Sequence, residues 1–168
     1  MKKKIILFFI SLIVPLIIAA QDIKFGYFSY TEVLKSMPEY AKATADLNVL
    51  KQKYDEEAKR SETDFRVLYE NFLEGQRNFA PTILKKRQAE LQDMMDRNIA
   101  FKKESERLLA KAEKEAFMPA KNKLNAAIIS IGEDKKYAFI FNTDNNTLPY
   151  INKYFGEDIT DLLKKLLK

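Results

Sequence analysis

The residues from Glu39 to Arg77 read EYAKATADLNVLKQKYDEEAKRSETDFRVLYENFLEGQR, and this stretch decides the fold. It is rich in Ala, Leu, Glu and Lys and contains no proline, a composition that favours a long helix. Apolar or small residues recur in steps of three and four, at Tyr40, Ala43, Leu47, Leu50, Tyr54, Ala58, Ser61, Phe65, Leu68 and Phe72. This spacing is a heptad seam with one irregularity near Tyr54, and it predicts packing along one face against another helix.

A break follows this helix, because Gly75, Asn78 and Pro81 lie within seven residues. A second helix is expected from Thr82 to about Met118, with a weaker seam at Leu84, Arg87, Leu91, Met94, Asn98, Phe101, Ser105, Leu108 and Ala112. Two arms of similar length predict an antiparallel helical hairpin, residues 39–118, with its tip near residues 75–81. One continuous helix is the alternative, but a proline in the helix interior would cost about 3 kcal/mol.

The segments on either side of the hairpin, residues 21–38 and 119–168, predict a small mixed body. Pro119 is expected to end the second arm, where the chain re-enters this body. The expected elements are a strand at Ile23–Phe28, a short helix from Ser29 or Thr31 to Met37, a helical stripe from Leu124 to Gly132, a strand at Tyr137–Phe141, a short third strand at Leu148–Ile151, and an amphipathic helix at Asp158–Leu167. The predicted fold class is therefore α+β, with a long coiled-coil-like arm that projects from a small β-containing body.

Residues 1–20 have the order of a secretory signal peptide. Three lysines at positions 2–4 precede an apolar run from Ile5 to Ile18, and Ala19 and Ala20 follow. The run is short for a membrane span, so we expect export and cleavage near Ala20, with an uncleaved N-terminal anchor as the alternative. The formal net charge of +5 loses these three lysines with the signal, so it does not indicate a nucleic-acid partner.

The chain contains no cysteine and no histidine, and it has only four glycines. Imidazole general bases, thiol nucleophiles and soft metal ligands are therefore missing from the sequence. The glycines form no phosphate-binding loop. We expect no enzymatic activity, no catalytic or metal site and no cofactor. A lipid-modified cysteine at the cut site is also excluded, so the mature protein is expected to be soluble.

The body is expected to be near the size at which small domains become marginally stable. Two or three short strands are not stable alone in water, and domains of this size bury little surface. The stretch YAFIF, residues 137–141, offers apolar side chains to both sides of a strand. We therefore expect a homo-oligomer in which the bodies share apolar residues, namely Phe25, Tyr27, Phe139, Ile140 and Phe141. The number of subunits does not follow from the pattern.

Three segments carry a family resemblance. IKFGYFSYTEVLKSMPEY (Ile23–Tyr40) is similar to an opening strand followed by a helix, KKYAFIFN (Lys135–Asn142) to a second strand, and DITDLLKKLL (Asp158–Leu167) to a final helix. In this order the segments resemble the Skp/OmpH family of periplasmic chaperones, whereas the arms match only as a generic helical hairpin.

The resemblance implies a homotrimer in which three hairpins surround a cavity. It also implies ATP-independent capture of unfolded outer-membrane proteins in the periplasm. A structural coiled-coil spacer or scaffold of the cell envelope is the alternative function. A scaffold is expected to have a regular seam with little spare apolar surface, whereas chaperone arms carry seam irregularities and exposed apolar side chains.

Apolar side chains outside the seam are the candidates for client contact: Val49, Val67, Tyr69 and Leu73 on the first arm, and Ile83, Met95, Ile99 and Leu109 on the second. They either line a client cavity or only widen the seam. A basic cluster lies near the tip, with Glu74 as the nearby acid, and consists of Arg77, Lys85, Lys86 and Arg87. It either meets anionic lipid headgroups and acidic client faces or is a solvated helix face.

Overall fold

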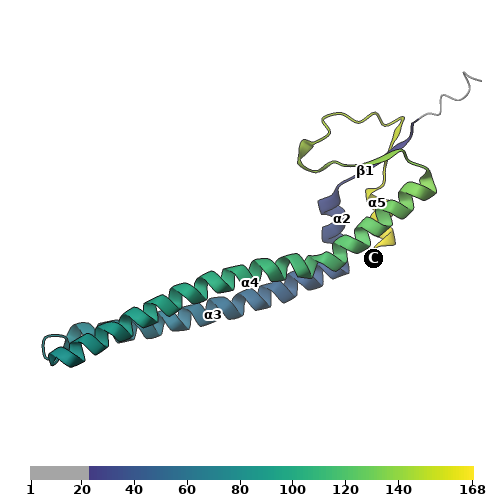
Figure 1. Ribbon diagram of the computed structural model, residues 1–168. Helices are drawn as coiled ribbons and strands as arrows, with labels where there is room; N and C mark the ends of the chain where they lie inside the picture. Colours follow the sequence, from purple (N-terminus) through teal and green to yellow (C-terminus); the bar gives the residue numbers. More distant parts are fainter. Residues whose placement is uncertain (1–22) are drawn as a thin grey trace, which may run out of the picture. The chain divides into compact units, whose positions relative to one another are not determined.

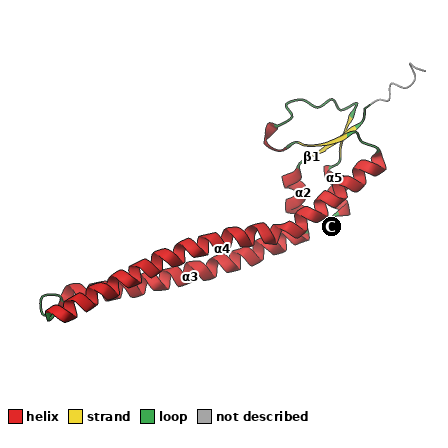
Figure 2. Ribbon diagram, viewed as in Figure 1, coloured by secondary structure: helices red, strands yellow, loops and turns green. Residues whose placement is uncertain are grey.

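A computed structural model describes residues 23–168, so the predicted signal peptide lies outside the described residues. Helix makes up most of the described chain, and the strands are short (Figure 2). The chain divides into two compact units, which are treated separately below. The hairpin unit comprises residues 37–122, and the described part of the body unit comprises residues 23–36 and 123–168.

The hairpin unit contains helix α3, Pro38–Gly75, and the first part of helix α4, Pro81–Lys135. Pro38 begins α3 at a position where no backbone N–H is needed. The helices run antiparallel and lie side by side (Figure 1), so the predicted hairpin is confirmed. Two aromatic pairs join them, Tyr40 with Phe117 at 4.7 Å and Tyr54 with Phe101 at 6.1 Å between ring centroids.

The predicted seam accounts for the packing of α3. All ten predicted seam residues of α3 are buried or half-buried. On α4 every predicted seam residue is likewise buried or half-buried except Arg87, which is exposed. Since one seam buries only one face of each helix, the remaining faces of the hairpin stay open to solvent.

The tip of the hairpin depends on a close approach at Gly75. A Cβ atom on Gly75 would lie 2.4 Å from the ring of Phe79, which also packs 6.3 Å from the ring of Phe72. The backbone N–H of Gln76 donates to the Phe72 carbonyl at 2.9 Å and closes the last turn of α3. The absence of a side chain at residue 75 thus lets the chain turn with an aromatic ring packed over the helix end.

One expected boundary is wrong. Helix α4 does not end at Met118 but continues through Pro119 to Lys135. Proline removes one backbone hydrogen bond and crowds the preceding turn, a local cost that the burial of the residues after it can offset. Ala120 and Leu124 are both fully buried, and Ala127 and Ile131 extend the same apolar stripe.

The body contains a three-stranded sheet in the order β2-β1-β3, and both pairings are parallel. The strands are β1, Phe25–Phe28, β2, Phe139–Asn142, and β3, Gly156–Asp158. In the register, Phe25 lies opposite Phe139 on one side and opposite Gly156 on the other. The expected third strand at Leu148–Ile151 is therefore wrong, because that segment belongs to the loop that follows the 3-10 helix η1, Asp144–Asn146.

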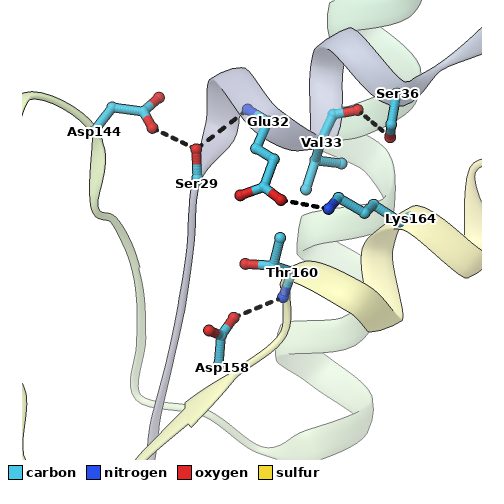
Figure 3. Close-up of polar contacts among 8 residues, drawn as sticks. All are labelled: Ser29, Glu32, Val33, Ser36, Asp144, Asp158, Thr160 and Lys164. Atoms are coloured by element: carbon cyan, nitrogen blue, oxygen red, sulfur yellow. Dashed lines mark hydrogen bonds and ion pairs between the residues drawn. The ribbon is translucent and has the colours of Figure 1, made fainter.

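Two short helices complete the body, α2, Tyr30–Ser36, and α5, Thr160–Leu166, and they contact each other. The core of the body consists of Phe28, Val33, Leu34, Leu124, Ala127, Ile131, Ile159, Leu163 and Leu167, all of which are buried. An ion pair between Lys164 and Glu32 joins α5 to α2, and the carboxylate of Asp158 accepts a hydrogen bond from the backbone N–H of Thr160 at 3.0 Å (Figure 3).

Asp144 ties the loop after β2 to the start of α2. The Ser29 hydroxyl donates to Asp144 at 2.6 Å and accepts the backbone N–H of Glu32 at 3.2 Å (Figure 3). The backbone N–H and the hydroxyl of Thr31 also donate to Asp144, at 2.9 and 2.7 Å. The hydrogen bond from Ser29, with those from Thr31 and Asn142, holds the pKa of the Asp144 carboxyl below its usual range.

We therefore expect Asp144 to contribute acid-sensitive stability. Because its pKa is lower in the folded state, its contribution is present above the ordinary aspartate pKa of about 4 and is lost as pH falls through the lowered value. Asp144→Asn should lower the melting temperature at pH 7 and flatten the loss of stability between about pH 5 and pH 3. Thermal denaturation across this range measures both effects. The exposed Asp134→Asn is the matched control, and equal pH profiles for all three proteins would contradict the assignment.

Candidate functional site

The predicted client-contact residues are mostly open to solvent. Seven of the eight are exposed, from 40% for Met95 to 61% for Ile99. These seven are Val49, Val67, Tyr69, Leu73, Ile83, Met95 and Ile99. The hairpin thus carries apolar surface that its own packing does not cover.

The seven residues share one relation to the seam, because each is next in sequence to a seam residue. Tyr69 follows Leu68, and Ile99 follows Asn98. Successive residues of a helix are about 100° apart, so these side chains lie on the shoulders of the seam. Tyr69 also stacks against the seam residue Phe65, with nearly parallel rings whose centroids lie 6.1 Å apart. Such a position holds a side chain at the helix surface without burying it.

Leu109 differs from the other seven, since it is half-buried. It lines a groove of about 400 Å³ together with Tyr40, Leu47 and Phe117 among others. Leu109 therefore lies beside the seam at this end of the hairpin. The predicted seam contains Leu108 but not Phe117, which stacks on Tyr40 in the structure.

The middle of the seam is polar. The Ser61 hydroxyl donates to the side-chain oxygen of Asn98, and the Asn98 amide donates back to the Ser61 carbonyl at 3.3 Å. A cavity of about 140 Å³ lies beside this pair and is lined by Ala58, Ile99 and Phe101 among others. The weak point expected in the second seam at Asn98 is thus a paired polar contact between the two helices. A polar pair of this kind fixes register at some cost in stability.

The basic cluster at the tip is partly neutralised by an acid that the sequence reasoning missed. Arg87 forms an ion pair with Glu90 at 2.9 Å, and Lys86 lies 3.7 Å from the same carboxylate. Glu90 is one turn further along α4, a spacing that favours such pairs. Arg87 also lines a cavity of about 300 Å³ beside Phe72, Phe79 and Leu91. Arg77 and Lys85 are exposed residues of the same region.

The residues expected to join the bodies surround the β2 edge of the sheet. Phe139 is 59% exposed and Phe141 is 37% exposed, whereas Ile140, Phe25 and Tyr27 are half-buried. Phe141 packs edge-on against Phe25 at 5.6 Å. A groove of about 640 Å³ runs beside β2 and is lined by Ile129, Phe139 and Ile140 among others. Parallel sheets are normally covered on both faces, and this one leaves part of its aromatic surface open.

Within residues 23–168, no group of three or more acidic, histidine or cysteine side chains lies close enough to hold a metal ion. In the same range, no helix is both long and apolar enough to cross a membrane. The features that remain are surfaces: the apolar shoulders of the hairpin, the basic tip and the open edge of the sheet.

These features define a helical-hairpin protein with a small parallel-sheet body and an apolar arm surface. The family model described as outer membrane protein (OmpH-like) matches residues 24–167. The chain therefore belongs to the OmpH-like family, and the resemblance seen in its terminal segments is confirmed.

A solved structure supports the fold. An OmpH-like protein from Caulobacter crescentus CB15, described as a candidate outer membrane chaperone, matches with a TM-score of 0.69 and 18% sequence identity. The match covers 85% of this chain and 82% of the Caulobacter chain. No curated protein sequence matches this chain. The two long helices and the small strand body are thus consistent with the OmpH-like fold.

We predict that the Ser61–Asn98 pair sets the register of the two helices. Asn98→Ala leaves Ser61 without its partner and should destabilise the hairpin by about 1–3 kcal/mol. Ser61→Ala combined with Asn98→Leu should restore or raise the melting temperature, because a polar pair is replaced by apolar contact. The register should then become less well defined.

Spin labels measure the register directly, since the chain has no cysteine of its own. Lys51→Cys and Lys111→Cys, both at exposed positions on opposite helices, provide the labelling sites. Pulsed electron resonance should give a narrow distance distribution in the parent and a broader one in the double variant. An equally narrow distribution in a more stable double variant would show that the pair does not set the register.

Proposed function

We propose that this protein is an ATP-independent holdase chaperone that binds unfolded outer-membrane proteins in the periplasm. The observation that carries the proposal is the row of exposed apolar side chains on the shoulders of the hairpin seam. Membership of the OmpH-like family and the described role of the Caulobacter protein support the same class of function. The predicted signal peptide, with cleavage near Ala20, supports the compartment.

The arm surface suits weak and unspecific binding. Each apolar side chain contributes at most about 1.5–3 kcal/mol when fully buried, and less at a surface that stays partly wet. Met95 adds a flexible side chain that adapts to different partners. Many such contacts, summed over several arms, hold an unfolded chain while each contact exchanges readily. Binding of this kind consumes no nucleotide.

Several arms per client require an oligomer, and we propose a homotrimer assembled through the bodies. The aromatic surface around β2, made by Phe25, Tyr27, Phe139, Ile140 and Phe141, is the proposed shared surface. An exposed apolar edge strand promotes aggregation unless another chain covers it. Covering β2 with a second and third copy removes that edge and brings three hairpins into one particle.

The basic tip is proposed to touch anionic membrane surfaces or acidic client segments transiently. Arg77 and Lys85 are the stronger candidates in this cluster, because Glu90 already pairs with Arg87 and Lys86. Exposed ion pairs are worth little and are screened by salt, so this contact should weaken as ionic strength rises.

The arm shoulders should be needed for holdase activity. Val67→Ser, Tyr69→Ser, Met95→Ser and Ile99→Ser, combined in one variant, should reduce suppression of aggregation of an unfolded β-barrel membrane protein several-fold, whereas each single change should have a small effect. Light scattering without nucleotide measures the suppression, and circular dichroism checks that the fold is kept.

A matched variant with four exposed polar residues changed instead, Gln52→Ser, Lys59→Ser, Gln92→Ser and Lys103→Ser, should protect the client as the parent does. The alternative function is a structural coiled-coil scaffold of the cell envelope, which would not need exposed apolar side chains on the shoulders of its seam. If the shoulder variant protects the client fully, the arms are not the client site and the scaffold function is favoured.

The trimer should depend on Phe139 in a way that separates assembly from folding. Because its side chain is 59% exposed, Phe139→Asp should leave the single chain folded yet place an unpaired charge in the proposed shared surface. We expect sedimentation to report monomers with native helix content. Ile140 contacts the region of Gly26 and Gly132, so Ile140→Asp should instead unfold the body. A stable monomer of the unmodified protein would refute the trimer.

A further inference from the structure

The loop that joins α3 to α4 forms the tip of the hairpin (Figure 1). A cavity of about 300 Å³ lies beside this loop. Its walls combine apolar and aromatic side chains with one cation and one amide: Leu68, Asn71 and Phe72 from α3, Phe79 from the loop, and Arg87 and Leu91 from α4. The exposed apolar shoulders of the hairpin include none of these six side chains, so the cavity is a separate feature.

The cavity lies where the seam carries a charge. Among the predicted seam residues of both helices, Arg87 alone is charged, and it stands between Leu84 and Leu91. Its guanidinium pairs with Glu90 at 2.9 Å and its side chain is 47% exposed, so it does not fill the seam as a leucine would. An unfilled layer forfeits apolar burial and dispersion contacts. A hairpin that served only as a spacer would be more stable with an apolar residue at this position.

The walls of the cavity are fixed by the folding of the tip. Phe79 packs against Phe72, with ring centroids 6.3 Å apart. Gly75 makes this packing possible, because a Cβ atom on it would meet the Phe79 ring. The backbone N–H of Asn78 donates to the Gly75 carbonyl at 2.9 Å and holds the turn that carries Phe79. The cavity is therefore part of the folded hairpin and is preformed for a ligand.

The size and lining of the cavity suit one aromatic side chain. An apolar cavity of about 150 Å³ is enough to bind benzene, so 300 Å³ accepts the ring of a phenylalanine or tyrosine. Phe72 and Phe79 offer edge-on or offset ring contacts. The Arg87 guanidinium, held by Glu90, attracts the face of an entering ring. An aliphatic side chain would bury apolar area there but would gain neither of the last two contacts.

The proposed client supplies such rings. Folded β-barrel membrane proteins carry girdles of aromatic residues at both membrane interfaces, so their unfolded chains expose many aromatic side chains. The exposed shoulder residues Tyr69 and Leu73 follow Leu68 and Phe72 in sequence, so apolar surface continues up to the cavity. We propose that the tip cavity binds one aromatic side chain of an unfolded client, an inference that rests on the proposed function for the source of the ring. A buried anchor of this kind contributes more to binding than the weak contacts around it.

Methyl NMR tests the proposal on the protein that lacks its predicted signal peptide. N-acetyl-phenylalanine amide at saturating millimolar concentration should shift the methyl resonances of Leu68 and Leu91, because its ring current acts on nearby groups. Leu47, which lines a different groove of the hairpin, should stay unshifted. An equal concentration of N-acetyl-leucine amide should not reverse the shifts, because it lacks the ring.

Two variants fill the cavity from opposite sides of one argument. Arg87→Leu completes the seam and should raise the melting temperature, whereas Leu91→Phe adds volume and keeps the cation. Both should lose the probe-induced shift of Leu68, and circular dichroism checks that the helix content is kept. Arg97→Leu is the matched control and should keep the shift, because Arg97 forms a similar exposed ion pair with Asp93 at 3.0 Å but does not line the cavity.

A peptide links the cavity to the client. An unstructured peptide with one phenylalanine should bind the parent several-fold more tightly than the same peptide with leucine, and Arg87→Leu should remove this preference. The proposal is overturned if the probe shifts neither Leu68 nor Leu91, if it shifts Leu47 equally, if the leucine amide reverses the shifts, or if the peptide preference survives in Arg87→Leu. Shifts at Leu68 and Leu91 that grow with protein concentration without a probe would instead assign the cavity to contact between copies. None of these readouts measures suppression of aggregation, so a failure of this proposal and a failure of the proposed function are distinguishable.

Discussion

Every other property of the hairpin depends on the single seam between α3 and α4. Ten seam residues of α3 pack against the matching face of α4, and each helix has just one such face. A seam of this width leaves its shoulders open, and the residues on these shoulders include the exposed apolar side chains of Val67, Tyr69, Met95 and Ile99. The residues whose burial stabilises the hairpin and the exposed apolar residues proposed to bind a client therefore occupy adjacent positions of the same helices.

The body is stabilised by a different combination of contacts, in which polar interactions supplement apolar burial. Its core is small, and long-range polar contacts supplement it: Asp144 joins the loop after β2 to α2, and Lys164 joins α5 to α2. Glu157 in β3 pairs with Lys135 at 3.0 Å and accepts a hydrogen bond from Tyr137, while burial and this contact raise the pKa of the Tyr137 hydroxyl. A sheet of three short parallel strands with exposed aromatic residues is consistent with a unit that is completed by assembly.

Sequence reasoning succeeded where the signal was periodic and local. The steps from Tyr40 to Phe72 predicted the buried face of α3, and Gly75 with Pro81 predicted the tip. Prediction from the sequence failed where contacts between residues far apart in the chain outweigh an unfavourable local backbone preference. Buried Ala120 and Leu124 carry α4 past Pro119, and Gly156 becomes a strand residue because its missing Cβ leaves room for the Phe25 ring, 2.5 Å from where that atom would lie. The ion pair between Arg87 and Glu90 could be predicted from their spacing of three residues along one helix. The exposure of Phe139 could not be predicted in this way, because it depends on the position of β2 at the edge of the sheet.

Site-specific photo-cross-linking tests most directly whether the seam shoulders hold the client. A photoreactive phenylalanine analogue is placed at Tyr69 or Ile99, and for comparison at Gln92, an exposed polar position of the same hairpin. With an unfolded β-barrel membrane protein and no nucleotide, the account predicts strong cross-links from the two shoulder positions and weak ones from Gln92. Equal cross-linking from all three positions, or none from the shoulders, would contradict it.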